Sequence, residues 1–458
     1  MLLIETPKGF DEDWRWILKT ILCNWLGVRY KRKSVEGIKN VYITSLKDSR
    51  CKSKIVLGAE FWLERTAGSK NFPNPTIPIS SYEISGHDYD KVMPQKTLPV
   101  LFKGIGSNSI PIDIFGSCFW MLARLEEITF SCGDKYKRFL AKDSLAKRCG
   151  FLLRPIVDEY VVFLEILLNK NFPDIITKPS QFELILSHDV DAINQFGYGY
   201  FRPRIRGLLR ELRKFNNVGL IKSGLKGFVM DPKIQDKADP FNTFNYLLKQ
   251  SAKRNLKSIF FFAAGRTDIK RDPGYMLNHP VVCDLLKKIH DAGSIIGLHP
   301  SFNTYNNLSE LEKEFKNLKK VCSSLSIHHH IWQSRMHYLR LSWPDTLKNL
   351  ASIGINKDHT MAFADHIGFR CGTSRQYRAY DPIERKEINL DIQPLVMMEC
   401  SLISSRYMNS AYSLASYDLI KTCKLVCRKL RTPFSLLWHN NHFNNPADKI
   451  LFEYSLDC

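Results

Sequence analysis

The sequence predicts an α/β protein in two parts, a smaller mixed α/β domain at residues 1–180 and a larger domain at residues 181–458. The length of 458 residues exceeds that of one typical domain. Pro173 and Pro179 interrupt regular structure near the expected boundary. Beyond it, apolar strand-like runs alternate with amphipathic helices. That rhythm is typical of βα units with a mostly parallel sheet, open or closed into a barrel.

The first part mixes both kinds of element. Apolar residues at helical spacing predict helices, and short β-branched runs predict strands. We expect helices at 11–26, 114–128 and 157–169, strands at 41–46 and 54–62, and a Pro-rich loop at 71–80.

The second part carries the βα rhythm. We expect strands at 182–187, 258–264, 294–299 and 434–440, and helices at 246–255, 279–292, 309–325, 344–353 and 414–430. Ser309, with Glu312 three residues later, predicts a capped helix start, and Gly293 and Gly354 predict helix ends. In such folds the active site forms at the carboxyl ends of the strands.

The charge is strongly positive, with 66 Lys and Arg against 46 Asp and Glu and a net charge of +20. This excess suits an anionic partner such as an acidic glycan, a membrane surface or nucleic acid. Residues 201–237 hold ten basic against three acidic residues and read as a basic insertion in the barrel domain. It is either a solvated helix or a contact for an anionic polymer or membrane surface.

Several classes are disfavoured. The first residues lack a basic region followed by a long apolar stretch, so we expect no secretory signal and a cytoplasmic protein. No apolar run reaches the ~18–20 residues of a membrane-spanning helix. The 12 Cys include no C-x-x-C pair, as expected of a reduced protein. Nucleic-acid binding has no zinc-finger spacing or aromatic RNA-binding motif in its favour.

Candidate functional residues follow the expected strands. Twelve of the 13 His lie beyond residue 180. Asp189 and Asp191 follow the first strand and share one face of an extended chain, a pairing that suits metal binding and proton transfer. His299 and His439 close later strands. Between these two lie Arg335 and His337 in SRMHYLR and Asp358 in INKDHT.

The candidate residues belong to five motifs, which contain in chain order Asp189 with Asp191, His299, Arg335, Asp358 and His439. In this order the motifs resemble those of the polysaccharide deacetylase family, also called carbohydrate esterase family 4 or the NodB homology domain. The resemblance covers roughly 181–445. SHDVD, IGLHPS, GFRCGT and LLWHN are also similar to a bacterial subgroup linked to surface-polysaccharide gene clusters. In that subgroup a further α/β domain comes first, and the segments IDIFGSCFWMLARLEEI and KRFLAKDSLAKRCGFLLRPIVDEY resemble it.

The resemblance implies a distorted, incomplete (β/α) barrel of the NodB type. It also implies metal-dependent removal of an acetyl group from an amino sugar, in a surface polysaccharide or its intracellular precursor. Zinc is the divalent metal we expect. The implied roles are Asp189 as base, Arg335 orienting it, His439 as general acid, Asp358 tuning His439, and Asp191 and His299 as metal ligands.

Two departures from the family pattern affect the metal site. Val190 separates two Asp that are usually adjacent, and Asn303 stands where a second His is usual. Asn is a weaker ligand for zinc. His337 is the substitute that we favour over His188, which should face away from the two Asp. The alternative is a catalytically weakened or inert glycan-binding relative.

Three more residues are candidates for substrate contacts: Arg370, Trp438 and Asn440. Trp438 and Asn440 also have structural interpretations, as a core Trp and a strand-capping Asn. Two further functions stay open. One is hydrolysis of another linear or cyclic amide on the same scaffold. The other is a non-enzymatic protein that binds a glycan or a membrane through 201–237.

Overall fold

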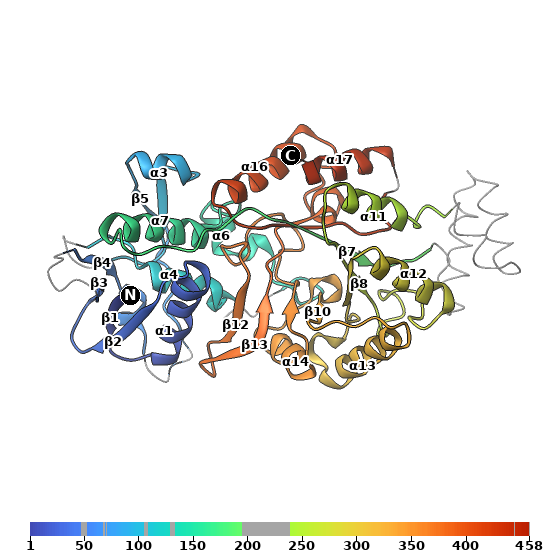
Figure 1. Ribbon diagram of the computed structural model, residues 1–458, viewed down its shortest axis with the longest axis horizontal. Helices are drawn as coiled ribbons and strands as arrows, with labels where there is room; N and C mark the ends of the chain where they lie inside the picture. The colour runs from blue at the N-terminus through green and yellow to red at the C-terminus, as the bar shows by residue number, and fades with distance from the viewer. Residues whose placement is uncertain are drawn as a thin grey trace, which may run out of the picture.

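The computed structural model describes residues 1–46, 53–66, 69, 71–104, 109–128, 133–194, 239–443 and 445–457. The expected basic insertion at 201–237 lies outside the described residues. Figure 1 shows the N-terminal part, in blue and green, beside a larger part in yellow to red that holds the main sheet. Within the described residues, no helix combines the length and apolar character needed to cross a membrane.

The N-terminal part contains a four-stranded sheet of order β2-β1-β3-β4, in which β1 is parallel to β2 and antiparallel to β3. Strands β5 and β6 form a separate antiparallel pair. Its elements are β1 (Leu2–Pro7), α1 (Asp11–Leu18), the π-helix η1 (Lys19–Trp25), β2 (Tyr30–Val35), β3 (Asn40–Ser45), β4 (Ile55–Gly58), α2 (Glu60–Glu64), β5 (Ser80–Glu83), α3 (His87–Val92), β6 (Thr97–Val100), α4 (Ile114–Leu122), α5 (Leu125–Ile128), η2 (Ala141–Asp143), α6 (Leu145–Arg148) and α7 (Ile156–Asn171).

The larger part is built around a nine-stranded sheet of order β12-β13-β11-β10-β9-β8-β7-β15-β14. Neighbouring strands are parallel except for the antiparallel pair β12–β13. Its strands are β7 (Leu184–Val190), β8 (Ile259–Phe262), β9 (Ile295–Leu298), β10 (Gln333–Ser334), β11 (Lys357–Asp358), β12 (Tyr377–Asp381), β13 (Lys386–Ile392), β14 (Met397–Met398) and β15 (Phe434–Leu437).

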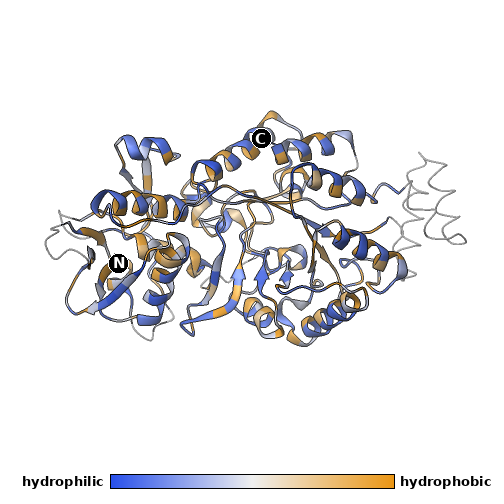
Figure 2. Ribbon diagram, in the orientation of Figure 1, coloured by the Kyte–Doolittle hydropathy of each residue, from blue (hydrophilic) through white to orange (hydrophobic). Residues whose placement is uncertain are grey.

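Helices connect these strands and cover the sheet. They are α11 (Phe244–Lys253), α12 (Pro280–Asp291), η3 (Thr304–Asn306), α13 (Leu308–Ser324), η4 (His337–Leu339), α14 (Asp345–Ile353), α15 (Glu399–Ile403), α16 (Leu414–Lys429) and α17 (Pro446–Asp457). In Figure 2 the outer helices α12 and α13 alternate between hydrophobic and hydrophilic residues. This is the pattern of helices with one buried face. Strand β8, by contrast, is apolar and buried at every position, as a central parallel strand should be.

The sheet curls into an open barrel. Ile392, the last residue of β13, pairs with Asp358, while Met397, the first of β14, pairs with Leu436 of β15. Only residues 393–396 separate the two strands, a stretch that spans at most about 19 Å. Strands β7 to β11, β13, β14 and β15 therefore follow one another around the barrel in chain order, with β15 back beside β7. Because β14 is an edge of the hydrogen-bonded sheet in the described residues, the barrel is incomplete.

The two parts pack against each other. The indole N–H groups of Trp16 and Trp25 donate to the carbonyls of Arg378 (3.1 Å) and Gln376 (2.9 Å). Asp158 of α7 accepts from residues of the barrel as well. One hydrophobic core cluster includes side chains from both parts. The division at residue 180 stays a prediction, although no helix or strand occurs between α7 and β7.

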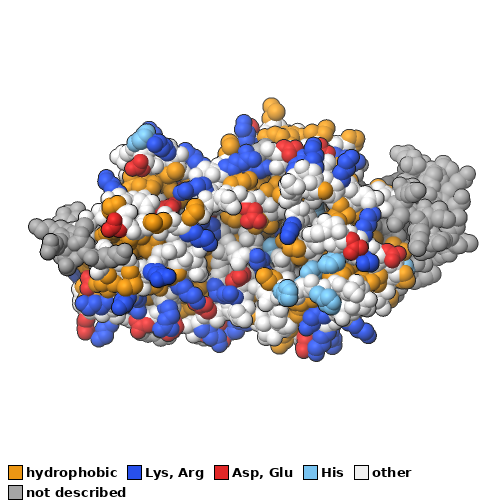
Figure 3. Space-filling view, in the orientation of Figure 1, with side chains coloured by type: hydrophobic (Ala, Val, Ile, Leu, Met, Phe, Trp, Pro, Cys, Tyr) orange, Lys and Arg blue, Asp and Glu red, His pale blue; other side chains and the backbone are white. Residues whose placement is uncertain are grey.

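Most expected helices and strands are confirmed within a few residues. The strand expected at 54–62 is wrong beyond Gly58, because helix α2 begins at Glu60, and one helix cap also differs. Helix α13 begins after Asn307, whose side chain accepts from the backbone N–H of Glu310 (3.2 Å). The expected Ser309 cap is therefore wrong by two residues. Gly293 and Gly354 do follow their helices with φ of 78° and 96°. Figure 3 shows Lys and Arg spread over both parts, so the positive charge is not confined to 201–237.

Candidate catalytic and metal site

A cavity of about 480 Å³ opens at the carboxyl ends of the barrel strands. It is large enough for a small-molecule ligand, since such pockets measure about 300–1,000 Å³. Its wall includes the candidate acids and histidines together with tyrosines and arginines. The lining residues are Arg138, Asp189, Asp191, His299, His337, Tyr338, Leu339, Met398, Cys400, Ile403, Ser404, Arg406, Tyr407, Tyr412, His439, His442, Asn445 and Asp448.

Asp189 is held at the end of β7 by Arg335. The guanidinium Nη1 donates to Asp189 Oδ1 (2.9 Å), and Nη2 donates to the Ser187 hydroxyl (2.9 Å). A third bond runs from Nε to the carbonyl of His359 (3.1 Å). Both Asp189 and Arg335 are buried. These bonds orient Asp189 and leave its second oxygen, Oδ2, toward the cavity, 3.9 Å from His299 Nε2.

Asp191, His299 and His337 form a group suited to a metal ion. Their ligand atoms all lie within 4.8 Å of one another. Asp191 Oδ1 is 3.4 Å from His299 Nε2 and 3.6 Å from His337 Nε2. Within the described residues, Asp191 Oδ1 and His299 Nε2 are buried without a hydrogen-bond partner. Buried polar atoms are rarely left without partners, so these two fit a bound cation.

Each His of this group is fixed through its other ring nitrogen. His299 Nδ1 lies 2.5 Å from the carbonyl of Arg335, and His337 Nδ1 lies 3.0 Å from Asp272 Oδ1. Such outer contacts fix the tautomer and the ring orientation of metal-binding His. They point both Nε2 atoms at Asp191, so the group is preorganised for a metal.

The charges in this group favour ionised forms. Burial by itself raises the pKa of Asp191. The neighbouring His337, His299 and His439 lower it by more than burial raises it, so the net pKa lies below its usual value. Burial lowers the pKa of His299, and the charges of Asp189 and Asp191 more than offset this, so that the net pKa is raised. The group therefore combines an anionic carboxylate with two nearby imidazoles.

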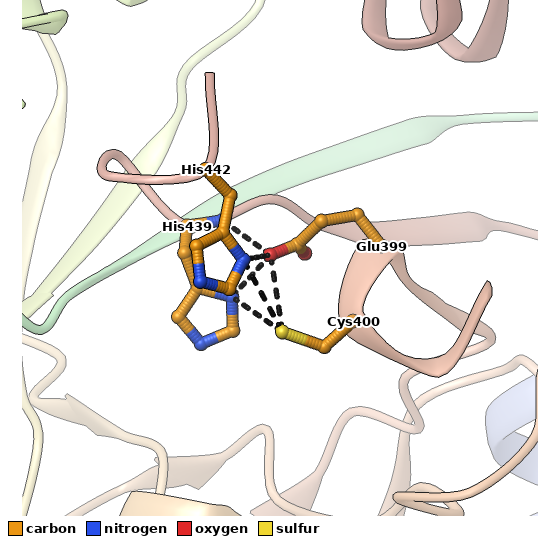
Figure 4. Close-up of side chains that lie close together, drawn as sticks. All are labelled: Glu399, Cys400, His439 and His442. Atoms are coloured by element: carbon orange, nitrogen blue, oxygen red, sulfur yellow. Dashed lines mark hydrogen bonds and ion pairs between the residues drawn. The ribbon is translucent and has the colours of Figure 1, made fainter. Parts of the chain in front are cut away.

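His439 lies on the other side of the two aspartates. Its Nε2 is 3.7 Å from Asp191 Oδ2 and 4.0 Å from Asp189 Oδ2. Its Nδ1 lies 2.5 Å from Glu399 Oε1. Figure 4 draws this contact as a dashed line. Burial lowers the pKa of His439, but the Glu399 charge raises it well above the usual value overall. His439 is therefore held as a proton donor that faces the cavity.

The carboxylate beside His439 is thus Glu399, which corrects the expectation for Asp358. Asp358 is buried at the end of β11, where it accepts from the Ser334 hydroxyl (2.8 Å) and the Thr360 N–H (2.9 Å) and hydroxyl (2.9 Å). Three hydrogen bonds occupy it there. Glu399 begins α15 directly after the short strand β14, and this position brings it against the loop that follows β15.

Glu399, Cys400, His439 and His442 make a second group with converging ligand atoms. Here both imidazoles lie at hydrogen-bond distance from one oxygen, since His442 Nδ1 is 2.7 Å from Glu399 Oε1. A tetrahedral zinc ion with bonds of about 2.0–2.3 Å keeps its donors roughly 3.3–3.8 Å apart. The distances at Asp191 match that spacing and those at Glu399 are shorter. The Asp191 group therefore fits a metal ion better, and the Glu399 group fits a hydrogen-bonded role.

The three expected substrate residues lie outside the cavity wall in the described structure. Arg370 forms a buried ion pair with Glu127 (2.6 Å) that joins the two parts of the chain. Trp438 is buried against Phe443 and donates to the carbonyl of His442 (3.0 Å). Asn440 is buried, and its side-chain amide donates to the carbonyls of Ala192 and Phe241. These positions correct the expectation of substrate contacts.

Two other residues that were considered as ligands, Asn303 and His188, lie outside both groups of converging ligand atoms. Asn303 bonds to Thr267 and is absent from both ligand groups. His188 is buried, its Nδ1 lies 2.8 Å from the Trp438 carbonyl, and it packs on Phe260, away from the aspartates. His337 lies with Asp191 and His299 in one group of converging ligand atoms, and its role as a ligand stays a prediction.

Sequence reasoning missed Glu399, Asp272, Tyr338 and Arg138. Glu399 stands in MMECS, beside Cys400, and nothing in that spacing marks a partner of a His 40 residues later. Arg138 comes from the N-terminal part, which the motif order did not connect with the site. The signal that could have found Tyr338 is its position directly after His337 in SRMHYLR.

Comparisons with known proteins add a family and two structural likenesses. Residues 2–173 match the model of a family of unknown function, DUF7033. No curated protein sequence matches the chain. Similar solved structures include a candidate polysaccharide deacetylase from Mycobacterium smegmatis, with 13% identity and a TM-score of 0.39 over 61% of this chain and 84% of that chain. Another is Puue allantoinase, with 11% identity and a TM-score of 0.35 over 60% and 83%.

Both of these neighbours carry the names of hydrolases. Because both TM-scores lie below 0.5, we base the function of this chain on the geometry of its own site.

Proposed function

We propose that this protein is a metal-dependent hydrolase that removes an acetyl group from an amino sugar of a surface polysaccharide or its precursor. One observation carries the proposal: three preorganised units meet in a single cavity. They are Asp189 bonded to Arg335, the ligand group of Asp191, His299 and His337, and His439 bonded to Glu399. A base, a metal site and a general acid are the parts that hydrolysis of an amide needs.

Asp191, His299 and His337 would hold a divalent metal, with zinc as our first expectation. The bound metal supplies a Lewis acid for the acetyl carbonyl. Asp189 takes a proton from the attacking water through Oδ2, the oxygen that Arg335 leaves toward the cavity. Arg335 keeps that carboxylate in place.

His439 acts on the leaving group. The C–N bond breaks as Nε2 gives its proton to the departing amine, so that acetate and a free amino sugar are released. Glu399 supports this step because it raises the pKa of His439 and holds Nδ1 at 2.5 Å. The two carboxylates thus have different roles. Asp189, positioned by Arg335, accepts the proton of the water, and Glu399 positions the general acid His439.

The acetylated amino sugar is proposed from the order of the sequence motifs, and the cavity supports it. Tyr338, Tyr407 and Tyr412 line the wall beside the acids and histidines. Tyrosines offer an apolar face and a hydroxyl, which suits a sugar ring. A cytoplasmic location, and a contact of 201–237 with an anionic polymer or membrane surface, stay predictions.

Acetate release tests the proposal. The wild-type protein loaded with zinc should release acetate from N-acetylated amino-sugar oligomers, a chelator should abolish release, and the metal should restore it. Asp189→Asn and His439→Ala should each lower the rate by about 10² or more, while His290→Ala, on α12, serves as the control. Undiminished activity in both site variants would overturn the mechanism. Hydrolysis of cyclic amides in place of acetyl sugars would change the substrate class alone.

A further inference from the structure

The N-terminal part of the chain reaches into the cavity through residues 133–138. Arg138, 4% exposed, lines the cavity together with the candidate catalytic residues. This segment falls within the region matched by the family of unknown function. The segment 133–138 therefore lies where a substrate bound in the barrel cavity would contact it.

Arg138 connects two tyrosines of the cavity wall. Its Nη1 donates to the backbone carbonyl of Tyr338 (3.1 Å), and its Nη2 donates to the Tyr407 hydroxyl (3.0 Å). The Asp134 carboxylate accepts hydrogen bonds from Arg138 Nε (3.0 Å) and Nη2 (2.6 Å), and these bonds fix the guanidinium. One side chain of the N-terminal part thus sets the position of two residues on separate barrel loops.

Tyr136 completes this contact from the same segment. Its carbonyl accepts from Arg340 Nε (3.0 Å), and its ring lies 5.2 Å from that of Tyr338 and 5.8 Å from that of Phe302. The Tyr338 ring in turn lies 4.7 Å from that of His337. The N-terminal segment therefore supports an aromatic surface that continues directly from the candidate metal site.

The backbone under this surface is strained. Tyr338 and Leu339 have φ of 61° and 54°, in the left-handed region that side chains other than Gly seldom adopt. Such a conformation is unfavourable and persists only where surrounding contacts hold it. The bond from Arg138 to the Tyr338 carbonyl is one such contact. Strain held by a second part of the chain, at the wall of a cavity, points to a role in ligand binding.

We propose that residues 133–138 build a subsite for the sugar ring adjacent to the acetylated one, with Tyr338 and Tyr407 as its contact surface and Arg138 as the residue that positions them. The ligand class follows from the chemistry of the wall. Two tyrosines supply flat apolar faces and hydroxyl groups, and the guanidinium supplies N–H donors, a combination that matches the C–H faces and hydroxyls of a saccharide. A cavity of about 480 Å³ also leaves room beyond the acetyl group.

The subsite rests on the proposed function for the identity of its ligand, so its first test is binding without catalysis. In the Asp189→Asn background, titration calorimetry measures the affinity for the N-acetylglucosamine tetrasaccharide and monosaccharide. Arg138→Met, which keeps the length of the side chain, should weaken tetrasaccharide binding about tenfold, as expected for a loss of about 1.4 kcal/mol. Monosaccharide affinity should stay within about twofold.

Tyr407→Phe removes only the hydroxyl that Arg138 contacts and should give part of the same loss. Combined with Arg138→Met, it should add less than its separate effect because both variants remove one shared bond. Arg154→Met is the matched control, since Arg154 is paired in the same way with Glu159 (2.6 Å) in the N-terminal part but lies outside the cavity. Zinc content and thermal unfolding show whether each variant keeps its fold and metal site.

Turnover gives the second readout. With the tetrasaccharide, Arg138→Met should raise KM about tenfold and leave kcat within about twofold, and hydrolysis of a small aryl acetate should not change. An unchanged KM and affinity for the tetrasaccharide, or an equal loss with the aryl acetate, would overturn the subsite. If wild type binds the tetrasaccharide but releases no acetate, only the proposed function falls. If Asp189→Asn binds no tetrasaccharide, the subsite is overturned.

Discussion

The pairing of Glu399 with His439 leads to a pH prediction that separates two candidate carboxylates. Glu399 is fully buried, and its Oε1 lies 2.5 Å from His439 Nδ1. Glu399→Gln keeps the shape and an oxygen acceptor but removes the negative charge. A hydrogen bond to a charged group contributes about 1.5–3 kcal/mol. At about 1.4 kcal/mol per pH unit, the pKa of His439 should fall by roughly 1–2.

The sign of the effect follows from the role of His439 as a proton donor. Glu399 stabilises the protonated imidazole, so its charge raises the pKa of His439 above the usual value. The rate of acetate release falls when pH rises above that pKa, because the donor has lost its proton. In Glu399→Gln this decline should begin roughly 1–2 pH units lower, while the acidic side of the profile stays in place.

The assay is kcat/KM for acetate release between about pH 6 and 10, with the metal saturating. Asp358→Asn is the matched control, because Asp358 is a buried carboxylate that bonds to Ser334 and Thr360 instead of His439. It should leave the alkaline decline where it is in wild type. A Glu399→Gln profile that coincides with wild type, or an equal displacement in Asp358→Asn, would refute the assignment of Glu399.

Three further predictions follow from the site and its supports. His337→Ala should weaken zinc binding by more than about 100-fold whereas Asn303→Ala should not, as metal analysis after dialysis would show; equal losses would reject the ligand set. Arg335→Met should lower the melting temperature and kcat together, because an unpaired buried Asp189 costs about 3–5 kcal/mol; an unchanged melting temperature would contradict this. Burial raises the pKa of Glu314 from 4.5 to about 7. The contribution of Glu314 to the free energy of unfolding is therefore greatest below about pH 4.5, and it falls by about 3 kcal/mol as the pH rises through 7. Glu314→Gln should flatten the dependence of denaturant unfolding on pH over that window, and an unaltered dependence would argue against the burial effect.

The regular elements of the barrel could be predicted because their residues satisfy local and tertiary preferences at once. Helices α12 and α13 have apolar residues on one face, and β8 is apolar throughout. The short strands β10, β11 and β14 have two residues each and were not expected. Two residues carry no periodicity, so such strands exist only because neighbouring strands offer them hydrogen bonds.

The residues of the candidate site likewise include some that the sequence could predict and some that it could not. Asp189, Asp191, His299 and His439 each follow or close an expected strand, whereas His337 comes after β10, a strand that was not expected. All five converge because parallel strands end at one edge of the sheet. Their partners come from segments without such a signal. The carboxylate beside His439 and the guanidinium in the cavity wall depend on how α15 and residues 133–138 fold over the barrel.

The sequence by itself determined the βα architecture, the order of the motifs and the residue types that gather in the cavity. Periodic burial and the positions of residues at strand ends can be predicted from the local sequence, without knowledge of distant contacts. Only the tertiary structure decided that Glu399 and not Asp358 contacts His439, that Arg370 is bound to Glu127, and that Arg138 joins the cavity. These pairings join residues far apart in the chain. The distance between Glu399 and His439 arises only when the barrel folds, and the contacts of Arg370 and Arg138 arise only when the two parts pack together.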